Sequence, residues 1–406
     1  ANIDLNKIPL KVTYAGRTVS ASTGWRMLDE MYAYDGDDLG ATYMNGNALL
    51  KLWAPKASRV AAIFYDKDDP AEIIGRLELT RGDKGVWSVL AKPEDFEGVE
   101  DLRGYFYQYE VTNDGITRTV LDPYAKSMAV FRVDTNGNAG PDGDTVGKAA
   151  IVDLSKTNPD NFIEANIKGY EKREDAIIWE VHVRDFTSDP SIEGDLNSRW
   201  GSYKAFIDKL DYIKSLGVTH IQLLPVMAWY YGDEAAMGER ELEYSTKDNN
   251  YNWGYDPHGY FSPDGAYSGN PYDPELRIRE LKELINAIHE AGMGVILDVV
   301  YTHMAKTSQL NDIVPNYYAW QDENGNFIGG FGNNLATNRK MAEKLLVDSV
   351  RYWFSEYKID GMRFDMMGDA TYDAIQKAYN AAAEINPKAL FIGEGWRTFS
   401  GHLSDP

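Results

Sequence analysis

From about residue 175 onward, short apolar runs alternate with stretches of helical periodicity. This alternation is typical of βαβ units, in which helices cover both faces of a sheet of parallel strands. Five parallel strands in this order predict the first part of a (β/α)8 TIM barrel. The predicted strands are 177–183, 219–226, 293–300, 361–367 and 390–396, and the predicted helices are 202–216, 273–291, 339–357 and 372–385.

The preceding part of the chain has short strands separated by glycine- and aspartate-rich turns. Alternation is clearest where one face is formed by Tyr105, Tyr107, Tyr109 and Val111 and the other by Gln108 and Glu110. Several such strands in succession predict an all-β sandwich. We therefore expect a multidomain protein with an N-terminal extension over 1–40, a β-sandwich over 41–150 and the first part of the barrel over 151–406.

Composition excludes several classes of function. The 406 residues include 41 Lys and Arg against 63 Asp and Glu, a formal net charge of −22, and such an acidic surface repels nucleic-acid phosphate. The chain has no cysteine, which excludes disulfides, thiolate catalysis and cysteine-ligated metals. No apolar run approaches the roughly 18 residues of a membrane span. Phe, Trp and Tyr make up 13 % of the residues, which suits stacking on sugars, although most are expected in cores.

Three acidic residues, Asp298, Asp365 and Glu394, stand at the ends of successive predicted strands. The C-terminal ends of parallel barrel strands form the active-site face, so these carboxylates are expected to converge there. Burying like charges together is costly unless they are used, which favours a catalytic role over a structural one.

Arg363 lies two residues before Asp365, so both side chains point to the same face of the strand. Its guanidinium is expected to lower the pKa of Asp365 and keep this carboxyl ionised, as a nucleophile requires. Trp396 is expected to form an apolar wall that raises the pKa of Glu394, as a general acid requires. Two such carboxyls about 5–5.5 Å apart are the equipment of retaining glycoside hydrolysis. The alternative is a buried ion pair of purely structural role.

The connection over residues 227–272 is much longer than an ordinary βα loop of about 2–6 residues. A long insertion on the active-site face predicts a substrate-binding structure. It contains the sequence YNWGYDP, in which Trp253, Tyr255 and Asp256 can stack on or hydrogen-bond a sugar. Tyr255 is expected to reach a sugar ring beside Asp365.

His303 follows the strand of Asp298 by five residues and could hydrogen-bond a substrate hydroxyl. An isolated loop histidine is more often without function, so this role stays one of two alternatives. No cluster has convincing zinc-ligand spacing, and neither a serine nucleophile elbow nor a glycine-rich phosphate loop follows a strand, so no metal site is predicted.

These motifs resemble the α-amylase family, glycoside hydrolase family 13. DVVYTH at 298–303, GMRFD at 361–365 and GEGW at 393–396 resemble its first three signature regions, and YNWGYDP matches the motif of type I pullulanases. Residues 48–127, with KLWAPKA and VLDPYAKS, are similar to the carbohydrate-binding module family 48 domain that precedes their barrels. The resemblance implies retaining endo-hydrolysis of α-1,6 linkages in pullulan, amylopectin and limit dextrins, through a covalent glycosyl-enzyme.

The resemblance also implies a role for each matching residue. Asp365 resembles the nucleophile, Glu394 the general acid/base and Arg363 the arginine that orients the nucleophile. The implied substrate contacts are Asp298, His303 and Tyr255, and Asp256, Trp253 and Trp396 are further candidates for substrate binding.

Among these contacts, Asp298 and His303 resemble residues that bind the sugar on the non-reducing side of the cleaved bond. Tyr255 resembles the tyrosine that stacks under that ring. The implied partners are α-glucan polysaccharides and malto-oligosaccharides.

The sequence departs from the family pattern at two points. Many α-amylases have an Asn immediately before the histidine of the first region, where it ligates calcium, whereas this chain has Thr302. No cofactor is therefore expected to be required, and calcium stays possible only without that ligand. The fourth region, a His-Asp pair after the seventh strand, is absent, because His402 and Asp405 do not reproduce it. The remaining C-terminal part of the enzyme is expected to supply that pair and strands six to eight, as further sequence or as a second chain.

Two other functions stay open. An isoamylase or an α-1,4-acting amylopullulanase is the runner-up, and a non-catalytic α-glucan-binding protein of the same fold is the alternative from another class. A first residue Ala1 and a polymeric substrate favour a bacterial protein that is secreted or held at the cell surface, with the cytoplasm as the alternative.

Overall fold

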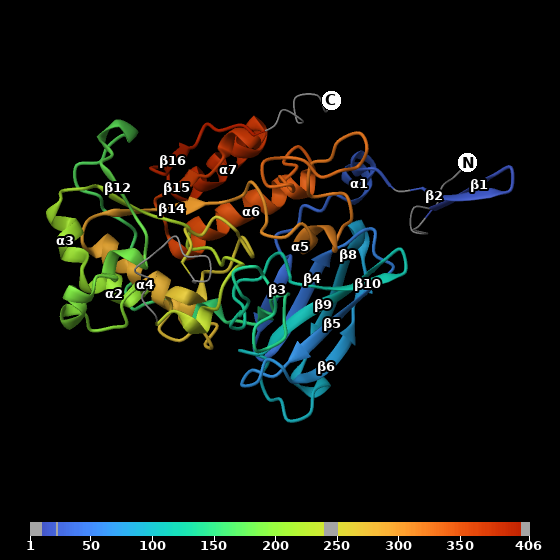
Figure 1. Ribbon diagram of the computed structural model, residues 1–406, viewed down its shortest axis with the longest axis horizontal. Coiled ribbons are helices and arrows are strands. Elements are labelled where there is room, and N and C mark those ends of the chain that lie inside the picture. Colours follow the sequence, from blue (N-terminus) through green and yellow to red (C-terminus); the bar gives the residue numbers. More distant parts are fainter. Residues whose placement is uncertain (1–9, 22, 239–250, 399–406) are drawn as a thin grey trace.

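The computed structural model describes residues 10–21, 23–238 and 251–398 (Figure 1). Its N-terminal domain is a sandwich of two antiparallel sheets, as predicted. One sheet has the strand order β3-β4-β8-β7, and the other has the order β10-β9-β5-β6 with β11 paired to β9. The strands are β3 (Gly40–Met44), β4 (Asn47–Trp53), β5 (Arg59–Tyr65), β6 (Ile73–Glu78), β7 (Thr80–Arg81), β8 (Val86–Ala91), β9 (Phe106–Asn113), β10 (Ile116–Val120) and β11 (Ala149–Ala150).

Strand β9 shows where the alternation rule holds and where it fails. Tyr107, Tyr109 and Val111 are fully buried, as the pattern predicts. Gln108 on the opposite face is also buried, because the chain at 146–147 covers it and its amide donates to the carbonyl of Val146 at 2.8 Å. A polar side chain on a strand is therefore buried here by a segment that is distant in the sequence.

The second domain is built on one sheet of five parallel strands in sequence order, which confirms the prediction of a partial barrel. Its strands are β12 (Ile178–Val181), β13 (His220–Leu223), β14 (Gly294–Val299), β15 (Gly361–Phe364) and β16 (Leu390–Gly393). They are shorter than predicted at their C-terminal ends. The residues beyond these ends turn out of the sheet, and Met366 has a positive φ of 49°.

Helices flank this sheet (Figure 1). The predicted helix 202–216 is divided into two, because Lys209 has a non-helical backbone with φ −111° and ψ 10°. The α-helices are α1 (Trp25–Tyr32), α2 (Tyr203–Asp208), α3 (Leu210–Ser215), α4 (Leu276–Glu290), α5 (Ser308–Asn311), α6 (Lys340–Tyr357) and α7 (Tyr372–Ile385).

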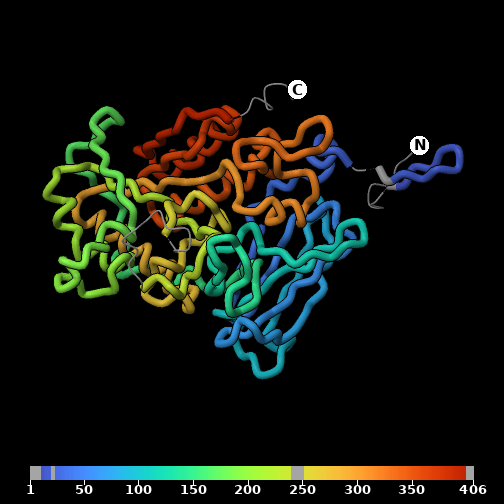
Figure 2. Tube along the Cα trace, in the orientation of Figure 1, coloured from blue at the N-terminus to red at the C-terminus, as the bar shows by residue number. Residues whose placement is uncertain are grey.

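A hairpin of β1 (Leu10–Tyr14) and β2 (Arg17–Ala21) projects from the body of the molecule, as the tube in Figure 2 shows. The predicted domain limits at residues 40 and 150 stay a prediction.

The sandwich is docked firmly on the barrel domain. One cluster of buried apolar side chains runs through both domains. Tyr124 of the sandwich stacks on Phe261 with 4.8 Å between ring centroids, and its hydroxyl donates to Asp348 of α6 at 2.9 Å. Arg103 forms a bidentate pair with Glu275 at the start of α4. The two domains are therefore expected to unfold together.

Replacing Tyr124 tests this docking. Tyr124→Ala is expected to lower the free energy of unfolding by about 3–5 kcal/mol, because it empties a buried aromatic site. Tyr124→Phe keeps the ring and is expected to cost only about 1 kcal/mol for the lost hydrogen bond. Urea denaturation measures both values, and equal losses for the two variants would contradict the role assigned to the ring.

Candidate active site

The guanidinium of Arg363 joins three carboxylates at the C-terminal end of the parallel sheet. Its Nη1 lies 2.9 Å from Asp298 Oδ1 and 3.2 Å from Asp365 Oδ1, and its Nη2 lies 3.0 Å from Glu394 Oε2. The structure thus brings together the three acids that the sequence placed at strand ends. We call these four residues the Arg363 cluster.

The register of the strands produces the Arg363 cluster. Asp298 on β14 lies directly opposite Arg363 on β15. The backbone N–H of Asp365 donates to Val299 at 3.0 Å, and that of Glu394 donates to Phe364 at 3.0 Å, so both acids extend the hydrogen-bonded ladder by one residue. The acids are therefore held by the backbone of the sheet rather than by mobile loops.

Burial determines the protonation of Asp365. It raises the pKa of this carboxyl, and although Arg363 lowers it, Asp298 and Glu394 raise it further, with a result of about 6. Arg363 lowers this pKa, as the sequence predicted, but desolvation outweighs one guanidinium, so the net shift is upward. Burial likewise raises the pKa of Asp298 to about 6, against the lowering effects of Tyr255 and Arg363.

Glu394 is held by polar partners. Its Oε2 accepts from the backbone N–H of Met366 at 3.1 Å and contacts Arg363. Trp396 is 65 % exposed, and its role as an apolar wall against Glu394 stays a prediction.

The carboxyls of Asp365 and Glu394 converge on one guanidinium, Asp365 at Nη1 and Glu394 at Nη2. Glu394 is close enough to raise the pKa of Asp365, so the two acids titrate as a pair. The separation of about 5–5.5 Å between the two carboxyls stays a prediction.

The segment 251–257, which we call the strap, reaches the Arg363 cluster. The hydroxyl of Tyr255 donates to Asp298 Oδ2 at 2.7 Å, and the Arg363 guanidinium lies 6.0 Å from the centre of its ring. Gly254 makes this possible: its φ is +91°, and a side chain there would meet Pro225 at 2.8 Å. Tyr255 is thus placed beside Asp298 and Arg363.

His303 lies under the strap. It is 2 % exposed, and its ring stacks on Phe331 with centroids 3.9 Å apart. Its Nε2 is 3.8 Å from Asp256 Oδ1, and among the described residues neither ring nitrogen has a hydrogen bond. A sugar hydroxyl is one group that could satisfy such a nitrogen.

Trp253 lies at the surface of the strap. Its indole is 57 % exposed, and its Nε1 donates to the hydroxyl of Tyr251 at 2.9 Å. Trp253 and Trp396 therefore present open faces, whereas the Arg363 cluster is largely enclosed.

Two residues that contact the site were missed as site residues. Thr302 Oγ1 donates to the backbone carbonyl of Asp365 at 3.0 Å. Thr302 occupies the position of the family's calcium-binding Asn, and in this chain it supports the backbone of the candidate nucleophile. Phe331 covers His303 from a loop with no recognisable motif. Only contact in three dimensions could reveal the second residue.

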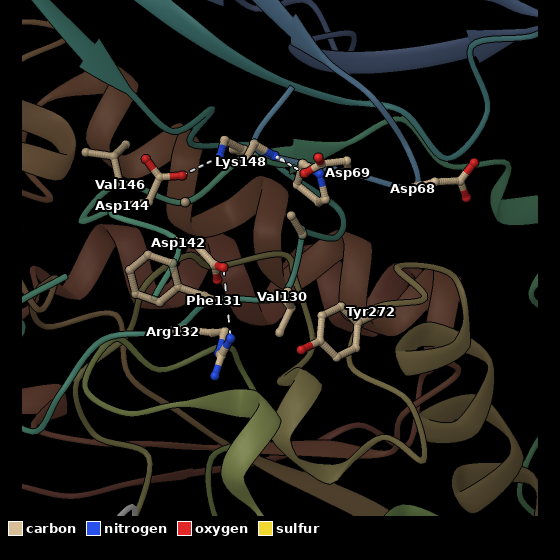
Figure 3. A pocket seen from close by; sticks show the side chains of 14 residues that line it. Asp68, Asp69, Val130, Phe131, Arg132, Asp142, Asp144, Val146, Lys148 and Tyr272 are labelled. Atoms are coloured by element: carbon tan, nitrogen blue, oxygen red, sulfur yellow. Dashed lines mark hydrogen bonds and ion pairs between the residues drawn. The ribbon is translucent and has the colours of Figure 1, made fainter. Parts of the chain in front are cut away.

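The described residues hold no group of three or more His, Asp or Glu side chains arranged to bind a metal ion. A cavity of about 210 Å³ lies elsewhere, between the sandwich and the barrel domain (Figure 3). In it, Arg132 pairs with Asp142 and Lys148 with Asp144, while Tyr272 lines the wall. Its lining includes no member of the Arg363 cluster, so the chemistry is assigned to the cluster and not to this cavity.

Comparison with known proteins bears on these observations. Residues 159–326 match the model "Alpha amylase, catalytic domain", and residues 38–125 match "Carbohydrate-binding module 48 (Isoamylase N-terminal domain)". Pullulanase A of Streptococcus pneumoniae is 46 % identical over 403 residues, which are 98 % of this chain and 31 % of that protein. Residues 159–326 thus match the catalytic domain of the α-amylase family.

Other relatives agree with the predicted type I pullulanase group. The pullulanase of Bacillus subtilis is 35 % identical over 91 % of this chain and 48 % of its own length. The catalytic module of the multi-modular glycogen-degrading pneumococcal virulence factor SpuA superposes with a TM-score of 0.90 at 46 % identity, covering 94 % of this chain and 54 % of that one. The Group B Streptococcus pullulanase SAP gives a TM-score of 0.92 at 45 % identity, covering 98 % and 50 %.

The chain spans about a third of Pullulanase A and about half of the B. subtilis pullulanase. Within the described residues, no helix combines the length and the apolar character needed to cross a membrane.

The raised pKa of Asp365 predicts a pH-dependent stability. Because the folded state holds this proton more tightly than the unfolded chain, the contribution of Asp365 to stability is complete below about pH 4 and is lost as the pH rises through about 6. Asp365→Asn is permanently neutral, so its stability relative to the parent protein is expected to increase between pH 4 and 7. Urea denaturation at a series of pH values tests this, and parallel profiles of the two proteins would refute it.

Proposed function

We propose that this chain carries the catalytic carboxylates of a pullulanase, which hydrolyses α-1,6 linkages in pullulan, amylopectin and limit dextrins with retained configuration. The observation that carries this proposal is the Arg363 guanidinium, which pairs with both Asp365 and Glu394 at the C-terminal end of the sheet. The similarity to pullulanases supports the α-1,6 specificity, and a relative, the pullulanase SAP, is described in complex with maltotetraose.

The proposed reaction has two steps. Asp365 in its ionised form attacks the anomeric carbon while Glu394 protonates the departing glycosidic oxygen, which leaves a glycosyl ester on Asp365. Glu394, now ionised, then takes a proton from water, and the resulting hydroxide displaces Asp365. Because the pKa of Asp365 is about 6, the first step is expected to slow as the pH falls below that value.

The other site residues bind the sugar in this proposal. Tyr255 stacks under the ring next to the cleaved bond, and Asp298 and His303 accept or donate hydrogen bonds to its hydroxyls. Asp256, Trp253 and Trp396 contribute further substrate contacts from the outer surface of the site.

A closed barrel is also part of the proposal. The described sheet has five strands with β12 and β16 at its edges, and the family's barrel has eight. We propose that strands six to eight, with a His-Asp pair, belong to the remaining part of the enzyme, on the same chain or a second one. The bacterial relatives and the polymeric substrate favour secretion or attachment to the cell surface.

No cofactor is required by this mechanism, since every step uses side chains. Thr302 stands where many family members have their calcium-binding Asn, and its hydroxyl already donates to Asp365. Dialysis against EDTA is therefore expected to leave activity unchanged, and a loss that calcium restores would contradict this part of the proposal.

Product analysis tests the function. The full-length protein is expected to release maltotriose as the sole product from pullulan, whereas Asp365→Asn and Glu394→Gln should lower kcat by at least about 10³-fold. Residues 1–406 alone should be inactive if the remaining strands are needed. Panose as product would replace the proposal with an α-1,4-acting enzyme. Glucan binding without any release of reducing sugar would favour the non-catalytic alternative.

A further inference from the structure

His182 connects strand β12 to the strap. It is the first residue after β12 and is 7 % exposed. Its Nδ1 accepts the backbone N–H groups of Arg184 at 3.1 Å and Asp185 at 3.3 Å. Since Nδ1 is an acceptor, the neutral ring carries its proton on Nε2. That proton is donated to the carbonyl of Asn252 in the strap at 2.8 Å.

A second contact joins the same two segments. The ring of Tyr251 stacks on the ring of His182, with centroids 5.8 Å apart and an interplanar angle of 29°. The hydroxyl of Tyr251 donates to Asp185 Oδ2 at 2.9 Å. The start of the strap is thus held against the end of β12 by two hydrogen bonds and a ring contact.

From this anchor the strap crosses the C-terminal ends of three strands. Asn252 is fixed at β12, Gly254 packs on Pro225 just beyond β13, and Tyr255 ends at Asp298 on β14. Only Trp253 and Gly254 separate Asn252 from Tyr255, so a shift of Asn252 moves Tyr255. His182 is therefore part of the path that sets the position of the Tyr255 ring.

We propose that His182 is a positioning residue, whose Nε2–H holds the strap so that Tyr255 is placed to bind the sugar beside the Arg363 cluster. This inference rests on the proposed function, according to which the site binds a sugar substrate. His182 does not itself touch the reacting atoms.

The groups around His182 are consistent with a neutral ring. Burial lowers its pKa, against a smaller raising effect of Asp185, whose Oδ1 lies 3.8 Å from Nδ1, while Arg184 lowers it further. The hydroxyl of Tyr267 lies 3.4 Å from Nε2, the long end of the hydrogen-bond range. The carbonyl of Asn252 is thus the main hydrogen-bond partner of the Nε2–H group.

Two substitutions separate the two ends of the ring. In His182→Asn the side-chain oxygen can still accept the N–H groups of residues 184 and 185, as in an Asx turn, but the side chain is too short to reach Asn252. In His182→Gln an amide N–H can occupy the place of Nε2 and restore the bond to the strap. Tyr267→Phe is the matched control, because it removes only the more distant polar neighbour of Nε2.

Kinetics in the full-length protein give the first readout. In His182→Asn the KM for pullulan is expected to rise about fivefold with kcat changed less than about twofold, since a ground-state contact is weakened. His182→Gln should recover most of this loss, and Tyr267→Phe should behave like the parent protein. In a Tyr255→Ala background, His182→Asn should add no further increase, because the two residues act through one path.

Hydrogen exchange gives a second readout that needs no activity. The strap amides are expected to exchange at least about fivefold faster in His182→Asn than in the parent protein and at the parent rate in His182→Gln. If the parent protein does not hydrolyse pullulan, the proposed function fails while this exchange result still decides the anchoring. Unchanged exchange in His182→Asn, or faster exchange with an unchanged KM, overturns the inference.

Discussion

A single guanidinium holds three acids together in this protein. Arg363 contacts Asp298, Asp365 and Glu394, each within 3.2 Å, at the end of a sheet where water is largely excluded. Without that cation the cluster would contain only like charges, and burial would drive the acids further toward their neutral forms. Arg363 therefore permits a site in which one carboxyl can be ionised beside another that keeps a proton.

The rest of the structure serves to hold this cluster and to cover it. The parallel register puts Asp298 opposite Arg363, and the strap brings the hydroxyl of Tyr255 to Asp298.

The sandwich supports the connection that follows His303. Asn113 donates to the carbonyl of Asp312 at 3.1 Å, and Lys56 donates to that of Pro315 at 2.9 Å. Figure 2 shows this connection lying against the sandwich strands. The N-terminal domain is thus part of the framework of the site.

The sequence predicted the features that depend on local pattern and on strand order. Acids at the ends of parallel strands must meet at one edge, so strand order alone assigns Asp298, Asp365 and Glu394 to one site. The direction of the net pKa shift of Asp365 could not be predicted from the sequence, because it depends on how much solvent the fold removes from around this carboxyl. The cover of Gln108 and the contact of Phe331 with His303 depend on segments distant in sequence. His182 could be located on its strand, but its link to Asn252 crosses a gap of 70 residues.

The central claim is that the pair held by Arg363 works by double displacement on Asp365. Proton NMR of the first sugar released by the full-length protein from an α-1,6-linked oligosaccharide tests this most directly. The account predicts that the α-anomer forms first and that the β-anomer grows in only by slow mutarotation, because two inversions at one carbon restore its configuration. Initial release of the β-anomer would show a single displacement by water and would contradict the role of Asp365 as nucleophile.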